Sequence, residues 1–218
     1  MCAYFVEAHG VMAPDSAKSR PRDVSTTYAG SATQAEGVFV RRGFLSPGAM
    51  VNVLGALDRL SAHWAGSEGL GLLGRGGTEQ VRPDNLAVQA QLDQIRLTLA
   101  PAVLAWARSC GFRLSAAPYL TLFPVRMVGS LEAPAHQEPH TDSHATLPGP
   151  PICTNVFYAR VTALNGGDIA VANALGDLDA ATILHPTPNT IVSFAGERVH
   201  WVQPLHAGER VSVVINFY

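Results

Sequence analysis

The first half of the chain has the hydrophobic spacing of helices. After Ser46, which can cap a helix, apolar residues recur every three or four positions as far as about Trp64, and this spacing predicts a helix with one buried face. A second helical pattern begins near Asp84. Pro101 either kinks this second helix or starts a third one that ends at Gly111.

From residue 118 onward, the pattern changes to short apolar runs separated by turn residues. Runs of this length that are rich in β-branched and aromatic residues predict strands. We expect them at 119–123, 152–161, 168–172, 190–194, 199–202 and 210–218, with an earlier strand at 37–41. Helices followed by strands predict an α+β fold, in which the N-terminal helices cover one face of a β-sandwich or barrel.

The composition divides the chain into a loose start and one folded unit. Residues 1–36 are rich in Ser, Thr, Ala, Gly and Pro without periodicity, so we expect a loose N-terminal extension or a lid. Residues 37–218 are predicted to form a single domain, with helical support at 45–111 and a β-core at 118–218. Six glycines at 65–82 predict a long flexible loop.

Charge and cysteine content exclude several classes of protein. The net charge is −2 and only 15% of the residues are charged, so no basic field exists to attract nucleic acid or an anionic membrane surface. No apolar run approaches the ~18 residues of a membrane span, and the first ten residues lack the basic start of a signal peptide. The three cysteines form no CxxC pair. Together these features predict a cytoplasmic protein.

Three metal-ligating side chains stand out in the β-rich half. His140 and Asp142 are two residues apart, so on a strand they would project to the same side, and His200 follows after enough chain to return to that place. Two histidines and one carboxylate on one face of an octahedron are the ligands of non-haem Fe(II) oxygenases. His136 and His144 lie close by and are alternative ligands.

The last predicted strand carries an unusual pair of polar residues. Alternation places Arg210, Ser212 and Asn216 on one face, and the apolar residues Val211, Val213, Ile215 and Phe217 on the other, which is the predicted core face. A buried guanidinium without a partner loses several kcal/mol of solvation. An anionic ligand is the natural partner, because a carboxylate can accept two hydrogen bonds from Arg210 and one from Ser212.

The ordered set His140-Thr-Asp142, His200 and Arg210-Val-Ser212 resembles the Fe(II)/2-oxoglutarate-dependent dioxygenases, and their prolyl-hydroxylase-like branch in particular. Further matches are a Gly-Gly turn at 165–168, an aromatic-ending strand at 155–158 and the segment 188–194 before the distal histidine. The resemblance covers 118–218. It implies a double-stranded β-helix, which is a jelly-roll or cupin-like barrel.

The resemblance implies a role for each matching residue. His140, Asp142 and His200 would ligate Fe(II) as the catalytic centre, while Arg210, helped by Ser212, would hold the distal carboxylate of the co-substrate 2-oxoglutarate.

Two further residues join the co-substrate site on the same basis. Tyr158 matches a position where a tyrosine often bonds the co-substrate, and Thr154 would share its face. Phe123 stands where close relatives often have tyrosine, and Tyr119 is a possible substitute.

The implied reaction uses O2 to oxidise an unactivated C–H bond, while 2-oxoglutarate is converted to succinate and CO2, with ascorbate as a possible support. Asp142 favours hydroxylation, or desaturation or ring formation, over halogenation, because related halogenases have Gly or Ala there. We expect a small amino-acid-like or biosynthetic metabolite as substrate. The alternatives are a protein or peptidyl-prolyl hydroxylase, and a cupin-like isomerase or metal-binding protein that does not use 2-oxoglutarate.

Overall fold

Two helices form in the N-terminal half of the computed structural model, which describes residues 32–35, 37–66, 74–75, 77–81, 85–143 and 149–218. Helix α1 spans Pro47–Arg59 and is capped by the Ser46 side chain. Helix α2 spans Leu86–Ser109 and is capped by Asn85, whose side chain accepts from the Val88 N–H at 2.9 Å. Pro101 lies inside α2, so the second helical pattern is one long helix and not two.

No helix in the described residues is long and apolar enough to cross a lipid bilayer.

The described parts of the Gly-rich segment after α1 are strands, so the prediction of a long loop at 65–82 is wrong for those parts. Helix α1 ends before the predicted Trp64 and is followed by the 3-10 turn η1 (Ser61–His63) and by β3 (Trp64–Gly66). Strands β4 (Gly74–Arg75) and β5 (Gly77–Val81) follow, while 67–73, 76 and 82 lie outside the described residues. Strand β5 pairs with a long neighbouring strand, and such tertiary pairing overrides a local preference for turns.

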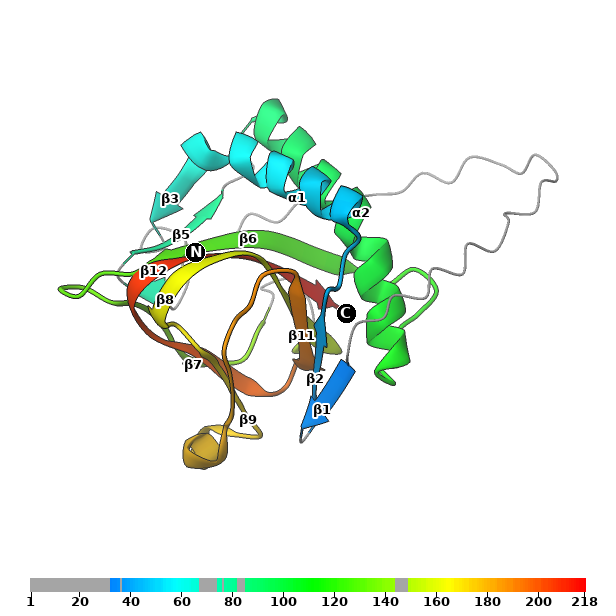
Figure 1. The fold of residues 1–218 in the computed structure, drawn as a ribbon. Coiled ribbons are helices and arrows are strands. Elements are labelled where there is room, and N and C mark those ends of the chain that lie inside the picture. The colour runs from blue at the N-terminus through cyan, green and yellow to red at the C-terminus, as the bar shows by residue number, and fades with distance from the viewer. Residues whose placement is uncertain (1–31, 36, 67–73, 76, 82–84, 144–148) are drawn as a thin grey trace.

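In the described residues, one antiparallel sheet of twelve strands and the 3-10 segment η3 (Leu175–Ala180) complete the fold. Its remaining strands are β1 (Ala32–Ala35), β2 (Val38–Arg42), β6 (Leu120–Val128), β7 (Ala135–His140), β8 (Cys153–Gly166), β9 (Ile169–Ala172), β10 (Thr182–Leu184), β11 (Thr190–Ala195) and β12 (Val199–Phe217). The main path runs β1-β2-β11-β8-β12-β6-β5-β3, while β7 and β9 pair with the first part of β12. Figure 1 shows this sheet curling into a barrel with both helices against its outer face. The jelly-roll architecture that the sequence predicts is confirmed.

Strand β12 connects the two walls of the barrel. The sequence predicts two strands, at 199–202 and 210–218, but the structure has one that continues through several register shifts. Its first part pairs with β7 and β9, and its second part pairs with β6 and β8. Gly208 has a φ of +86° and a close backbone neighbour, because a Cβ there would lie 2.3 Å from Thr162 O. Glycine therefore permits the bend that hides the continuity of β12 in the sequence.

Two other segments join the sheet against expectation. No strand is predicted between 124 and 151, because prolines such as Pro139 disfavour one, yet β7 lies there and pairs with β12. Strand β1 belongs to the predicted N-terminal extension and pairs with β2. The rest of that extension, 1–31 and 36, lies outside the described residues.

The two faces of the sheet have different contents. On β12, the face that holds Val211, Val213, Ile215 and Phe217 packs into one buried cluster with residues of α1 and α2, as the alternation predicts. Buried polar bonds tie α2 to this face, since Trp106 Nε1 donates to Ser193 Oγ at 3.0 Å and Ser193 Oγ donates to Asn155 Oδ1 at 2.7 Å. The opposite face of β12 looks into the barrel and carries the buried polar residues described below.

Candidate metal centre and anion pocket

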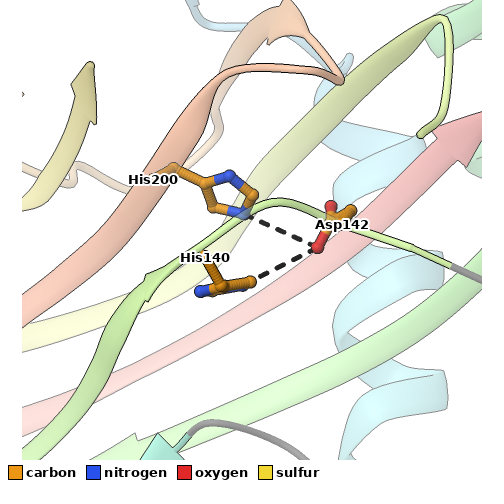
Figure 2. A group of neighbouring side chains, drawn as sticks. All are labelled: His140, Asp142 and His200. Carbon is orange, nitrogen blue, oxygen red and sulfur yellow. Dashed lines mark ion pairs between the residues drawn. The ribbon is translucent and has the colours of Figure 1, made fainter. Parts of the chain in front are cut away.

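Three side chains meet inside the barrel near the end of β7. His140 ends β7 and is the register partner of His200 on β12, while Asp142 follows two residues after His140. One ligand atom from each residue lies within 4.8 Å of the other two. Asp142 Oδ1 is 3.7 Å from His140 Nε2 and 3.6 Å from His200 Nε2, as the dashed lines in Figure 2 show. The structure therefore brings together the three residues that the sequence singles out.

Strand alternation does not explain the position of Asp142. Strand β7 ends at His140, so the argument that two residues on one strand share a side does not apply to Asp142. Its carboxylate is instead fixed by two donors: Thr154 Oγ1 and Asn216 Nδ2 each lie 3.0 Å from Asp142 Oδ2.

Backbone carbonyls fix the direction of both imidazoles. His140 Nδ1 lies 2.7 Å from Glu138 O, and His200 Nδ1 lies 3.2 Å from Arg198 O. Because a carbonyl oxygen can only accept, each Nδ1 carries the hydrogen, and in a neutral ring the Nε2 lone pair is left for a metal. The Phe194 ring packs against His200 with the ring centroids 4.9 Å apart.

The electrostatics of the cluster favour the protonation states that a metal needs. Burial, together with the charge of His200, lowers the pKa of His140 and so favours its neutral form. Burial would raise the pKa of Asp142, but its interactions with His200, His140 and Thr154 outweigh that effect and lower the pKa to about 2. At neutral pH, an ionised carboxylate therefore stands beside a neutral imidazole, as metal binding requires.

The two alternative ligands do not join this cluster in the part of the chain that the structure describes. His136 turns to its own strand, where its ring nitrogens contact Pro134 O at 3.0 Å and Glu138 Oε1 at 3.2 Å. His144 lies outside the described residues.

A second polar group lies on the same inner face, at the other end of the second part of β12. Arg210 is 2% exposed, and its Nη1 donates to Gly167 O at 2.8 Å. Its guanidinium stands over the ring of Tyr158, 5.0 Å from the centroid. Burial lowers the pKa of Arg210, although Tyr158 and Asp168 nearby oppose this shift, and burial raises the pKa of Tyr158.

This group has hydrogen-bonding capacity that the described residues leave unused. Arg210 Nε and the Tyr158 hydroxyl are buried and have no partner of suitable geometry among them. Ser212 is buried beside them as the register partner of Tyr158. Unpaired polar atoms at this depth are costly, which makes the group a pocket suited to an anion.

The structure separates the remaining predicted co-substrate residues from this anion pocket. Thr154 donates to Asp142 and so lies at the metal end of the inner face. Tyr119 packs its ring 6.0 Å from that of Tyr218, and the Tyr218 N–H donates to Tyr119 O at 2.9 Å. Since Tyr218 follows Asn216 closely, Tyr119 is also nearer to the metal end than to Arg210.

The observed geometry fits Fe(II) and a dicarboxylic co-substrate. Metal–ligand bonds at such sites are about 2 Å long, so ligand atoms of one ion lie about 3 Å apart or slightly more, and the separations from Asp142 Oδ1 are only a little larger. Two imidazoles and one carboxylate suit non-haem iron. Unmet donors at Arg210 and Tyr158 suit a carboxylate.

The sequence assigns no role to three residues at this site. Alternation places Asn216 on the correct face of the last strand, but only the register between β12 and β8 shows that it reaches Asp142. The Gly-Gly turn is visible in the sequence, but only the structure shows that the Gly167 carbonyl accepts from Arg210. Phe194 ends a predicted strand, and nothing in its spacing points to His200.

Comparison with known proteins identifies the fold. No family profile matches the sequence, and no curated protein sequence matches it. Among solved structures, a Pseudomonas putida prolyl-4-hydroxylase is 17% identical, with 83% of this chain and 91% of that chain covered and a TM-score of 0.57. A prolyl hydroxylase from Trichoplax adhaerens, solved with a peptide fragment of hypoxia inducible factor, is 15% identical, with 83% of each chain covered and a TM-score of 0.58.

A third similar structure is the non-haem alpha-ketoglutarate-dependent epimerase SnoN from nogalamycin biosynthesis. It is 17% identical, with 84% of this chain and 77% of that chain covered and a TM-score of 0.60. The chain therefore has the double-stranded β-helix fold of the solved 2-oxoglutarate- and Fe(II)-dependent oxygenases, the prolyl hydroxylases among them.

Proposed function

We propose that this protein is a non-haem Fe(II)- and 2-oxoglutarate-dependent oxygenase. The observation that carries the proposal is the pairing of two sites on one inner face of the barrel. One is the cluster of His140, Asp142 and His200, and the other is a buried arginine with unused donors. A metal site alone would fit many proteins, but a metal site that shares a barrel interior with a carboxylate pocket fits a co-substrate that bridges the two.

The residues divide into two groups by position. His140, Asp142 and His200 would hold Fe(II) through atoms that already face one another. Arg210 and Tyr158 would hold the distal carboxylate of 2-oxoglutarate, with Ser212 as a further donor. When bound, Fe(II) with 2-oxoglutarate and O2 supplies the oxidising power to break an unactivated C–H bond, and the co-substrate is converted to succinate and CO2.

An apolar band separates the two groups. Val214 on β12 is the register partner of Val156 on β8 and of Phe123 on β6, and Val192 on β11 is the partner of Val156. This band lies between Asn216 and Ser212 on the inner face. It suits the methylene carbons of 2-oxoglutarate and would exclude water from the space between the two polar ends.

We propose hydroxylation of a small amino-acid-like or biosynthetic metabolite as the reaction. Most of the described residues belong to the sheet and its two helices. The described chain therefore shows no additional folded unit that would bind a protein substrate, which favours a small substrate. Asp142 fills the carboxylate position, which favours hydroxylation, desaturation or ring formation.

Peptidyl-prolyl hydroxylation is the second candidate. It is favoured by the fold shared with two prolyl hydroxylases, one of them solved with a peptide. The third possibility is a metal-binding isomerase or binding protein that does not use 2-oxoglutarate. It provides no ligand for the unused hydrogen-bond donor of the buried Arg210. We also propose a cytoplasmic protein with a single folded domain at 37–218, in keeping with the free Cys110 and Cys153 of the described chain.

Purified protein with Fe(II), ascorbate, O2 and 2-oxoglutarate tests the proposal. Succinate should form and should increase when the correct substrate is present in a panel of amino acids, related metabolites and proline-containing peptides. His140→Ala should abolish succinate formation. Turnover of peptides alone would select the second candidate. Absence of succinate with every member of the panel, together with unchanged metal content in His140→Ala, would overturn the assignment.

A further inference from the structure

Two side chains on neighbouring strands hold the same oxygen of Asp142. Thr154 on β8 and Asn216 on β12 are register partners, so they project from adjacent strands to the same side of the sheet. Both are buried, with exposed fractions of 0% and 2%. Thr154 Oγ1 and Asn216 Nδ2 each donate to Asp142 Oδ2 over 3.0 Å. Two donors from a rigid sheet thus leave Oδ1 as the oxygen that faces the histidines.

The same row of the sheet also supports a histidine. Phe194 on β11 is the register partner of Thr154, and its buried ring packs 4.9 Å from the ring of His200. Asn216, Thr154 and Phe194 therefore form one row across three adjacent strands, which we call the support row. Its side chains contact two of the three metal-cluster residues, Asp142 and His200.

Asp142 needs such support because its own backbone provides little. It follows the end of β7, whose last residue is His140. The strand pairing that fixes His140 and His200 ends before Asp142. The orientation of its carboxylate therefore depends on the side chains that contact it.

We propose that Thr154 and Asn216 are positioning residues that set the metal affinity of the site by holding Asp142 as a ligand through Oδ1 alone. This inference rests on the proposed function. It reassigns Thr154 from the co-substrate to the metal ligand and gives Asn216 a role. With Oδ2 occupied by two donors, the carboxylate supplies one ligand atom, so three positions of an octahedral ion stay open for a chelating co-substrate and a third group.

The orientation of Asn216 follows from its partner. A carboxylate oxygen only accepts, so the Nδ2 side of the amide must face Asp142, which leaves the Oδ1 side facing away. Asn216→Leu keeps the approximate size and removes the donor, and Asn216→Asp would place a second negative charge against Asp142. Thr154→Val removes one hydroxyl at constant shape, and Thr154→Ser keeps it.

Mn(II) binding to the full chain, measured by calorimetry without oxygen, tests the proposal independently of turnover. Thr154→Val and Asn216→Leu should each weaken Mn(II) binding by about 10- to 100-fold, the usual effect of losing a partner of a metal ligand. Thr154→Ser should restore affinity to near that of the wild type. Ser193→Ala is the matched control, because it removes buried hydrogen bonds on the other face of the sheet, and it should leave Mn(II) affinity unchanged.

The outcomes separate this inference from the proposed function. Wild-type affinity in both Thr154→Val and Asn216→Leu would overturn the positioning role and leave the oxygenase assignment intact. Equal Mn(II) binding by wild type and His140→Ala would instead overturn the metal site itself. If Asn216→Leu fails to fold, the Thr154→Val and Thr154→Ser pair decides alone, since equal weakening in both would mean that the hydroxyl is not what matters.

Discussion

The groups that would contact a ligand at the two polar ends of the barrel interior differ in how far their hydrogen bonds are satisfied. At the metal end, Asp142 Oδ2 accepts from two side chains, and the Nδ1 atoms of His140 and His200 each face a backbone carbonyl. The buried atoms without a described partner at this end, Thr121 Oγ1 and Asn216 Oδ1, belong to residues outside the ligand cluster. At the other end, Arg210 Nε and the Tyr158 hydroxyl are buried without partners in the described chain. Both ends lie on the same face of the same strands.

This contrast indicates two different kinds of binding site. The metal end is preorganised, so its ligands are already oriented when the ion arrives and little reorganisation is needed. At the arginine end, buried donors without partners lower the stability of the free protein. A bound carboxylate would accept hydrogen bonds from these donors, and this would strengthen its binding. Substitutions at the first end should therefore affect metal binding, whereas substitutions at the second end should trade stability against co-substrate affinity.

Removal of a histidine from the metal end should have the largest effect. We expect His200→Ala to weaken Mn(II) binding by more than about 100-fold, because loss of a ligand exceeds the 10- to 100-fold cost of losing a partner of a ligand. His185→Ala is the control, since that exposed histidine pairs with Asp168 outside the cluster. Calorimetry of both variants measures the difference. Similar weakening in the two would mean that the loss is not specific to the cluster.

Replacement of Arg210 should separate stability from binding. We expect Arg210→Met to weaken 2-oxoglutarate binding by more than about 100-fold, because breaking a buried charge pair costs about 3–5 kcal/mol. The free energy of unfolding without ligand should change by less than about 3 kcal/mol, because removal of a buried charge offsets the loss of the hydrogen bond to Gly167 O and of the contact with the Tyr158 ring. Urea unfolding and calorimetry provide both numbers. A loss of more than about 3 kcal/mol in stability with unchanged 2-oxoglutarate affinity would make Arg210 a structural residue.

A substitution on the helix-facing side of the sheet should lower stability and leave ligand binding unchanged. Trp106→Phe removes the donor to Ser193, which leaves a buried polar network short of one bond. We expect unfolding to become easier by about 1–3 kcal/mol. Metal and 2-oxoglutarate affinities should stay at wild-type values, because this network lies on the far side of the sheet from the pocket. Loss of either affinity would show that the two faces are coupled.

Loss of the Tyr158 hydroxyl should have the smallest effect. Because this hydroxyl has no described partner, Tyr158→Phe should leave the free energy of unfolding unchanged or slightly higher. Binding of 2-oxoglutarate should weaken by roughly fivefold, which corresponds to about 1 kcal/mol for one hydrogen bond. A calorimetric titration of the metal-loaded variant measures it. Unchanged affinity would remove Tyr158 from the co-substrate pocket.

Local patterns in the sequence predict those helices and strands that are specified by residues within the segment itself. The caps and spacing of α1 and α2, and the alternation along the last strand, follow from residues within each segment. The sequence does not predict β5 or β7, because glycine and proline in these segments favour turns and only pairing with β6 and β12 makes them strands.

The candidate site shows the same limit. The spacing of His140, Asp142 and His200 was enough to group them, because ligand types and order carry the chemistry. The places of Thr154 and Asn216 could not be foreseen, since they depend on the register between β8 and β12. A shift of that register by one residue would place the two side chains on opposite faces of the sheet.

The linkage between metal and 2-oxoglutarate tests most directly whether the two ends form one site. Titrate 2-oxoglutarate into the wild-type protein without oxygen, once with saturating Mn(II) and once without metal, and repeat with Mn(II) as the titrant. A co-substrate that bridges both ends should bind at least about tenfold more tightly with Mn(II), and Mn(II) should gain the same factor from 2-oxoglutarate. Equal affinities with and without the partner would show independent sites and would contradict a shared catalytic centre.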